Sequence, residues 1–307
     1  MTRVAAVDCG TNTIKLLVAD LDPVTGSETE LVREMRMVRL GQDVDRTGRL
    51  ADEALARTFA AVDEYAAVVV AHDVEAIRFC ATSAARDASN ADDFAAGVRS
   101  RLGVAPEVVS GAEEAQLSYD GATRGLVGRG LAEPLLVVDI GGGSTELILG
   151  DGHGHVRAAQ SLDIGSVRMT ERHLRSDPPS PQEVAAAAEE IVTAVAASDV
   201  PLAQARTVIG VAGTVTTVAA GVLGLDGYDR AAIDQAELAF PDVHATTVML
   251  LAMTVAERRA LPYMHPGRAD VIGAGALILD EVLRRTTATS LLVSEADILD
   301  GIAWSIA

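Results

Sequence analysis

The sequence predicts an α/β protein built from two related domains. The chain has 307 residues, a length that corresponds to about two domains. Apolar runs typical of strands alternate with helical patterns along the chain, as in α/β folds. One strand–turn–strand pattern also occurs twice. We therefore place the domains at residues 1–128 and 129–298, and expect a closing helix at 299–307 that is able to pack back on the first domain.

The repeated pattern is an apolar run, an Asp-x-Gly turn with small polar residues, and a second apolar run. The first copy is Val4–Asp20 (VAAVDCGTNTIKLLVAD) and the second is Leu135–Gly150 (LLVVDIGGGSTELILG). Their aspartates, Asp8 and Asp139, are 131 residues apart. Turn residues between two apolar runs are typical of a β-hairpin, so each domain is predicted to contain one such hairpin.

Periodicity and capping residues predict the other elements. Strands are expected at Ile14–Ala19, Glu75–Cys80, Pro106–Val109, Thr145–Leu149, Arg206–Gly210 and Ser290–Val293. Helices are expected at Ala51–Ala71, Asn90–Leu102, Ala112–Gly121, Val167–Leu174, Gln182–Ala197, Thr214–Gly221, Val248–Ala256, Arg268–Arg285 and Ile298–Ile306. Ser176–Pro181, Pro262–Gly267 and the HGH stretch at 153–155 are expected to be loops, and residues 225–245 show no clear pattern.

Composition and charge narrow the function classes. The net charge of −19 argues against a broad basic face for nucleic acid. The two cysteines, Cys9 and Cys80, form no disulfide framework or metal motif. The N-terminus does not resemble a signal peptide, and no charge-free apolar run reaches the length of a membrane span. We therefore expect a cytoplasmic protein that binds neither nucleic acid nor membrane.

The two hairpin turns are candidate phosphate and metal sites. Glycines let backbone N–H groups approach phosphate oxygens, and hydroxyls add donors. An Asp at the strand end can hold a divalent cation. The alternative is a tight turn that needs Gly only for its geometry, but the repetition favours ligand binding. In the first copy the candidate phosphate-binding residues are Gly10, Thr11, Asn12 and Thr13. No dinucleotide fingerprint or P-loop motif is present.

Three further stretches contain candidate residues. Gly213 and Thr214 follow a predicted strand and open a helix, where an anion can bind, although a packed turn with a Thr cap would show the same pattern. Arg86 follows another strand and suits a forked contact with phosphate, although a lone Arg is more often in a surface ion pair. Glu113 and Glu114 begin a helix, where carboxylates usually complement the helix dipole. Between two phosphate-binding turns, such a Glu is a candidate base for water.

Together these stretches resemble the exopolyphosphatase/guanosine pentaphosphate phosphatase (Ppx/GppA) family of the actin, sugar-kinase and Hsp70 superfamily. The resemblance is carried, in chain order, by DCGTNT (8–13), ATSAARDASN (81–90), SGAEEAQL (110–117), DIGGGSTEL (139–147), GVAGTVTT (210–217) and RAD (268–270). It implies two actin-like (ribonuclease H-like) domains with an active-site cleft between them, and it implies a homodimer. The longest family members have an additional helical C-terminal region, so the chain resembles the short, two-domain members.

The resemblance also implies roles for individual residues. Glu114 matches the catalytic base, Arg86 matches an arginine held to phosphate, and the implied cofactor is Mg²⁺. Asp8, Asp139 and Glu146 match acidic metal-binding or water-organising residues. The match to the phosphate loop comprises Gly141, Gly142, Gly143, Ser144 and Thr145.

The expected function is Mg²⁺-dependent hydrolysis of a terminal phosphoanhydride by water that Glu114 activates. The substrate is inorganic polyphosphate, guanosine pentaphosphate (a nucleotide of the stringent response) or both. The acidic net charge opposes steering of a polyanion, so either the substrate is short or the site is locally positive. Four cations would make the site positive: Lys15, Arg86, Arg168 and Arg268. Lys15 is also a candidate phosphate ligand. The alternatives are a kinase of the same superfamily, for which no sugar pocket is evident, and a non-catalytic polyphosphate or nucleotide sensor.

Overall fold

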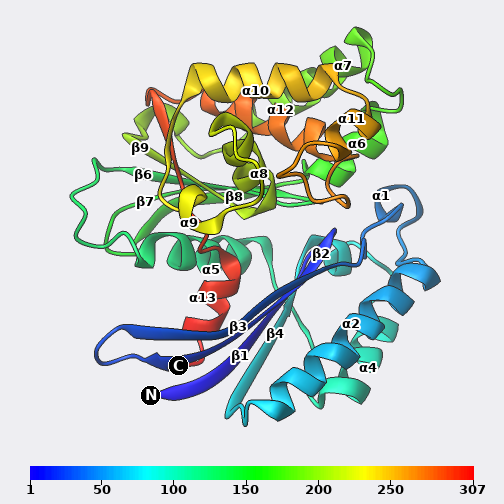
Figure 1. Cartoon of the computed structure of the whole chain (residues 1–307), viewed down its shortest axis with the longest axis vertical. Coiled ribbons are helices and arrows are strands. Elements are labelled where there is room, and N and C mark those ends of the chain that lie inside the picture. Colours follow the sequence, from blue (N-terminus) through cyan, green and yellow to red (C-terminus); the bar gives the residue numbers. More distant parts are fainter. The chain divides into compact units, whose positions relative to one another are not determined.

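The computed structural model describes residues 1–307, which divide into two compact units (Figure 1). The first unit comprises Met1–Gly121 together with Ile298–Ala307, and the second comprises Ala122–Asp297. The C-terminal segment therefore belongs to the unit that contains the N-terminus. No helix of the chain combines the length and the apolar character that crossing a bilayer requires.

The first unit contains a five-stranded sheet of order β3-β2-β1-β4-β5. Its strands are β1 (Thr2–Cys9), β2 (Thr13–Asp22), β3 (Ser27–Met37), β4 (Ala76–Ala81) and β5 (Glu107–Val108). Its helices are α1 (Val44–Thr47), α2 (Asp52–Ala71), α3 (Ser83–Arg86), α4 (Ala91–Leu102), most of α5 (Gly111–Arg124) and α13 (Ile298–Trp304). Strands β1 to β3 form an antiparallel meander, whereas β4 lies parallel to β1 and β5 parallel to β4.

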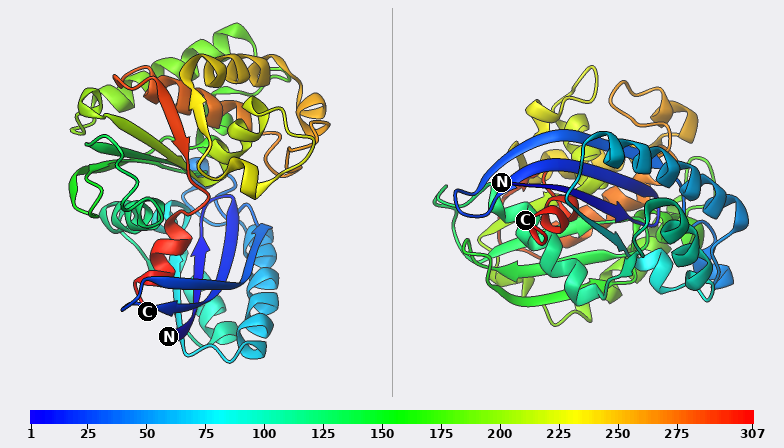
Figure 2. Two further views of the ribbon diagram at one scale, coloured as in Figure 1. Left: turned by 60° about the vertical axis from the view of Figure 1, so that its left-hand side comes forward. Right: turned by 90° about the horizontal axis from the view of Figure 1, so that it is seen from below.

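Alternating side chains of β1 supply both faces of this sheet, because successive strand residues point to opposite sides. Ala5, Val7 and Cys9 belong to the core beneath α2 and α4, which lie side by side (Figures 1 and 2). Val4 and Ala6 belong to a second core that contains Leu117 of α5 and residues of α13. A Cβ on Gly301 of α13 would lie 1.9 Å from the Leu117 carbonyl oxygen, so α13 can approach α5 this closely only with glycine there.

The second unit contains a six-stranded sheet of order β10-β11-β9-β6-β7-β8. Its strands are β6 (Leu135–Ile140), β7 (Thr145–Gly150), β8 (Val156–Leu162), β9 (Thr207–Val211), β10 (Glu237–Ala239) and β11 (Ser290–Val293). Its helices are α6 (Ser166–His173), α7 (Pro181–Ala196), η1 (Leu202–Gln204), α8 (Ala212–Val222), α9 (Arg230–Ile233), α10 (Phe240–Ala252), α11 (Val255–Arg259) and α12 (Ile272–Leu283). Helices α6, α7, α8, α10 and α12 contribute to one large hydrophobic core with the sheet.

The two sheets share one construction, which confirms the predicted α/β class with two related domains. In both, an antiparallel three-stranded meander is followed by a strand parallel to its first strand. The offset of 131 residues also holds in three dimensions. Asp8 lies opposite Lys15 and Asp139 opposite Glu146, and the parallel pairs Val4–Ala76 and Leu135–Thr207 have the same spacing.

Several boundaries differ from those predicted. The third strand of each meander, β3 and β8, was not predicted; the first half of β3 is exposed on both faces, so it lacks an apolar alternation. The helix expected at Val248–Ala256 is wrong, because α10 begins at Phe240 with Pro241 in its first turn and ends at Ala252. Thr254 then caps the separate helix α11. The helix expected from Arg268 begins only at Ile272.

Candidate active site

The glycine turn after β6 presents a row of backbone N–H groups. Gly141 N–H closes the hairpin by donating to the Ser144 carbonyl at 3.0 Å, as Gly10 N–H does to the Thr13 carbonyl at 2.9 Å in the first unit. No protein group accepts a hydrogen bond from the N–H groups of Gly142, Gly143 or Ser144. Successive N–H groups in such a turn form a concave site for an anion.

The first residues of helix α6 bind the backbone carbonyls of this glycine turn. The Gly141 carbonyl accepts from Ser166 N–H at 2.9 Å, and the Gly142 carbonyl accepts from the N–H groups of Val167 at 2.8 Å and Arg168 at 3.1 Å. The Arg168 Nε donates to the Gly143 carbonyl at 2.7 Å. The free N–H groups at the start of a helix are thus used to bind the turn. The turn is fixed through its carbonyls, which leaves its N–H side for a ligand.

Gly165 makes this close approach possible. A Cβ on Gly165 would lie 2.4 Å from the Gly142 carbonyl oxygen and 2.5 Å from its carbonyl carbon. Gly165 and Ser166 were not among the predicted site residues, because the stretch DIGS (163–166) is typical only of a turn before a helix. A glycine directly before a predicted helix is the one local signal of the contact.

The first unit holds its own glycine turn in the same way. The Asn12 carbonyl accepts from the N–H groups of Val38 at 3.1 Å and Arg39 at 2.9 Å, and the Thr11 carbonyl accepts from Gly41 N–H at 2.8 Å. A Cβ on Gly41 would lie 2.3 Å from Thr11 Cγ2. In both units, therefore, a later segment containing a glycine packs against the turn and binds its carbonyls.

Two buried carboxylates lie next to the turn of the second unit. Asp139 on β6 and Glu146 on β7 are directly opposite each other, and their exposed fractions are 6% and 1%. Cross-strand neighbours project from the same face of a sheet, and adjacent carboxylates favour a shared cation. The chain has no cluster of three or more ligating side chains. A pair of carboxylates fits Mg²⁺, which usually binds one or two carboxylates, water and substrate phosphates.

The corresponding position in the first unit is a cation. Asp8 lies opposite Lys15, and its Oδ2 is 3.4 Å from Lys15 Nζ. The structure thus places both predicted residues together and pairs them with each other. Within its own unit, Asp8 already has a positive partner, whereas the second unit has Glu146 at the equivalent position.

Glu114 and Arg86 meet at the end of the first sheet. Strand β4 lies beside β1 and leads into α3, which ends at Arg86. Arg86 Nη1 donates to Glu114 Oε2 at 3.0 Å and to the Val109 carbonyl at 2.9 Å. Glu114 is only 6% exposed. Its neighbour Glu113 is exposed and pairs with Arg78 at 2.5 Å. The structure therefore distinguishes two glutamates that are equivalent in sequence, and only Glu114 is buried against a cation.

The third glycine turn lies beside the second in the same sheet. Strand β9 is parallel to β6, with Val211 opposite Asp139, so Gly213 and Thr214 follow the neighbouring strand end. This edge is where α/β sheets usually bind ligands. Ala212 begins α8 with φ of +67°, a strained conformation for a residue with a side chain. Strain of this kind is concentrated at functional sites.

Arg268 packs against the start of α8. A Cβ on Gly213 would lie 2.4 Å from its guanidinium carbon, and Arg268 Nη1 donates to Thr217 Oγ1 at 3.3 Å. Burial lowers the pKa of Arg268 from its usual value. A cation at the positive end of a helix is unfavourable by itself but favourable when an anion joins them. Gly213, Thr214 and Arg268 therefore form a second candidate anion site.

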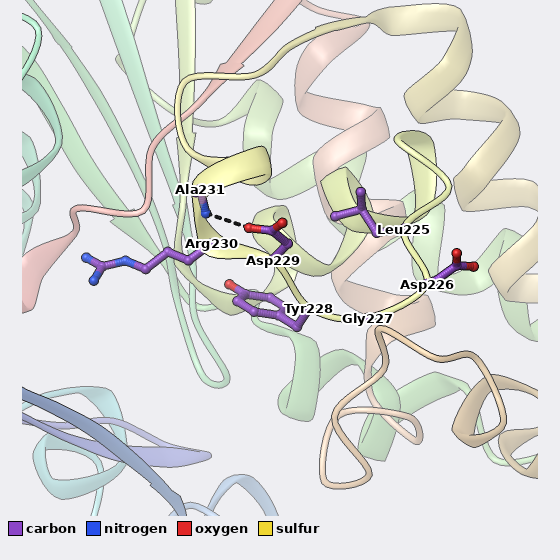
Figure 3. Close-up of a pocket in the computed structure, with 7 residues that line it drawn as sticks. All are labelled: Leu225, Asp226, Gly227, Tyr228, Asp229, Arg230 and Ala231. Atoms are coloured by element: carbon purple, nitrogen blue, oxygen red, sulfur yellow. Dashed lines mark hydrogen bonds between the residues drawn. The ribbon is translucent and has the colours of Figure 1, made fainter.

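A surface pocket of about 510 Å³ lies in the stretch that showed no clear sequence pattern. It is lined by residues 225–231 (Figure 3). The Tyr228 hydroxyl donates to Glu295 at 2.6 Å, and the Asp229 carboxylate accepts from the N–H groups of Ala231 and Ala232. Arg230 and Asp226 point away from the loop in different directions (Figure 3). The pocket includes none of the predicted site residues.

Comparisons with known proteins identify the family and the fold of the chain. The model of the Ppx/GppA phosphatase family matches residues 18–307. The chain is 48% identical to Exopolyphosphatase 2 of Mycobacterium tuberculosis over an alignment of 320 positions, which covers 100% of this chain and 99% of the relative. The crystal structure of an exopolyphosphatase-like protein has a TM-score of 0.96 at 44% identity, covering 100% of this chain and 98% of that chain. The PPX-GPPA enzyme of Aquifex aeolicus has a TM-score of 0.82 at 30% identity and 99% coverage of both chains. The predicted α/β class with two domains is confirmed, because solved Ppx/GppA and exopolyphosphatase structures share this fold along nearly the whole chain.

Proposed function

The chain belongs to the Ppx/GppA phosphatase family, and from this membership we propose that it hydrolyses the terminal phosphoanhydride of inorganic polyphosphate, guanosine pentaphosphate or both. The observation that carries the proposal is the glycine turn at 141–144. Its carbonyls are bound by α6, and the N–H groups of Gly142, Gly143 and Ser144 have no protein acceptor. A phosphate group is the ligand that such a turn suits. Gly213, Thr214 and Arg268 supply further donors.

Glu114 is the group that activates water. Its carboxylate accepts a proton as the water oxygen forms a bond to the terminal phosphorus, and the bridging P–O bond breaks toward the leaving phosphate. The hydrogen bond from Arg86 fixes the position of one carboxylate oxygen. Catalysis of this kind depends mainly on positioning and charge stabilisation.

Mg²⁺, which Asp139 and Glu146 would hold, supplies positive charge to the phosphate oxygens when bound. The two carboxylates are part of the sheet, so their separation is set by strand pairing. Asp8, the third metal-binding residue inferred from the family resemblance, is paired with Lys15. We therefore propose that Asp139 and Glu146 are the main ligands of Mg²⁺. Asp8 instead forms the ion pair that positions Lys15.

The basic residues favour short substrates. Of the four cations that we expected to attract a polyanion, Lys15 pairs with Asp8 and Arg86 pairs with Glu114, so carboxylates of the same unit offset their charges. Only Arg168 and Arg268 keep a net charge, because they hydrogen-bond to the neutral Gly143 carbonyl and Thr217 hydroxyl. With a net charge of −19, long-range repulsion of a long polyphosphate is not offset by a basic track. We therefore propose that short chains are better substrates than long ones.

The proposed function is tested by phosphate release from four compounds in the presence of Mg²⁺: short polyphosphate, long polyphosphate, guanosine pentaphosphate and ATP. We expect release from short polyphosphate or from guanosine pentaphosphate, and less from long chains at low salt. Loss of the signal on Mg²⁺ removal would support the cofactor assignment. Tight binding without release from any of the four compounds would instead identify a sensor and would contradict the proposal.

Arg86→Ala is expected to lower kcat by roughly 10²-fold, a typical effect of removing one donor that stabilises charge. If Arg86 acts mainly by fixing Glu114, its removal should have little additional effect in a Glu114→Gln background, because residues that act as a unit are not additive. Steady-state kinetics of the two single variants and the double variant measure this. Fully multiplicative losses in kcat would show that Arg86 acts on the phosphate independently of Glu114.

A further inference from the structure

Three polar residues form a row across the meander of the second sheet. Asp139 on β6 is directly opposite Glu146 on β7, and Glu146 is directly opposite Ser161 on β8. Residues paired across neighbouring strands project from the same face. All three side chains therefore lie on one face of the sheet, next to the glycine turn that joins β6 to β7.

Ser161 contacts the carboxylate of Glu146 directly. Its Oγ donates to Glu146 Oε1 at 2.7 Å. Glu146 is 1% exposed and lies on a strand that has a neighbour on each side. A buried carboxylate is costly unless it is hydrogen-bonded, and this bond restricts how the carboxylate group can rotate. Ser161 itself does not belong to the glycine turn.

The first unit has a corresponding row of three residues, but without a pair of carboxylates. Its equivalent residues are Asp8, Lys15 and Met35. There the ion pair between Asp8 and Lys15 is formed by the chain itself, and the third residue is an apolar side chain. In the second unit the middle residue is an acid, and the third residue is a hydroxyl that binds it. The second unit therefore has both the carboxylate pair and the hydroxyl of Ser161, whereas the first unit has neither at the equivalent positions.

We propose that Ser161 is a positioning residue, which holds Glu146 in the orientation in which Glu146 and Asp139 bind a divalent cation. The inference rests on the proposed function for the identity of the cation. Ser161 acts through Glu146 and has no contact with the substrate. Groups that orient a metal-binding carboxylate typically affect metal affinity by 10- to 100-fold when removed.

The test is divalent-cation binding to the full-length chain, with Mn²⁺ as the probe and electron paramagnetic resonance as the readout. Ser161→Ala should weaken Mn²⁺ binding by roughly 10- to 100-fold and raise the Mg²⁺ concentration for half-maximal phosphate release. Ser161→Thr, which keeps the hydroxyl, should stay close to the wild type. Ser290→Ala is the matched control, because Ser290 Oγ donates to Glu237 at 2.5 Å elsewhere in the same unit.

The proposal is overturned if Ser161→Ala binds Mn²⁺ as tightly as the wild type, if Ser290→Ala is weakened equally, or if the wild type binds no Mn²⁺. Should Ser161→Ala not fold, Ser161→Cys provides the same comparison, because a thiol has nearly the same shape but is a weak donor; weaker Mn²⁺ binding supports the proposal and unchanged binding overturns it. A wild type that binds Mn²⁺ but releases no phosphate would contradict the proposed function, while the binding data would still decide the role of Ser161.

Discussion

Glu114→Gln is expected to lower kcat by roughly 10²–10⁴-fold, the usual contribution of a general base. Glutamine has the same shape and can still accept the hydrogen bond that Arg86 donates to Glu114, so the fold and the substrate affinity should be preserved. It cannot accept a proton from water at neutral pH. Phosphate release measures the loss, and thermal unfolding followed by circular dichroism checks the fold.

The neighbouring glutamate is a matched control for this variant. Glu113 is adjacent in sequence and carries the same charge, but it is exposed and pairs with Arg78 on the surface. Surface ion pairs contribute about 0–1 kcal/mol, so Glu113→Gln should keep the wild-type rate. A Glu114→Gln enzyme that works as fast as Glu113→Gln would remove Glu114 from the mechanism and leave it a structural partner of Arg86.

Gly165→Ala is expected to lower kcat by roughly 10²-fold, because a displacement of about 1 Å at a positioned group has this effect. The new Cβ would lie 2.4 Å from the Gly142 carbonyl oxygen, and neither backbone segment can yield by rotating a side chain. Either the glycine turn or the start of α6 must move. Overpacking of this kind also costs about 1–3 kcal/mol of stability, which denaturant unfolding would measure together with phosphate release.

Gly227→Ala provides the comparison in the same unit. No atom lies within 4 Å of a Cβ built at Gly227, so the substitution adds a methyl group to open space. It should leave phosphate release unchanged. If Gly165→Ala is destabilised but as active as Gly227→Ala, the contact between α6 and the turn serves the fold alone, and the turn does not need to be held to bind phosphate.

Local sequence was sufficient for the two hairpins and for most helices and strands. Turn residues between two apolar runs predict a strand–turn–strand unit, and both turns close as expected. It was not sufficient for β3 and β8. An exposed edge strand such as β3 has no apolar face to alternate, so periodicity gives no signal. The boundaries of α10 and α12 were also misplaced, because Pro241 and the turn before Ile272 determine where these helices begin.

The sequence by itself determined the class of fold, the internal repeat and the residue types that suit phosphate and a divalent cation. These are properties of short segments, in which spacing along the chain decides conformation. Only the tertiary structure decided which glutamate is buried. Glu114 is buried and forms an ion pair with Arg86, whereas Glu113 is exposed and pairs with Arg78. It alone showed that Asp8 is paired with Lys15, and that Gly165 and Ser161 support the turn and Glu146. Each of these facts depends on a contact between distant segments, and strand register and helix packing bring such segments together.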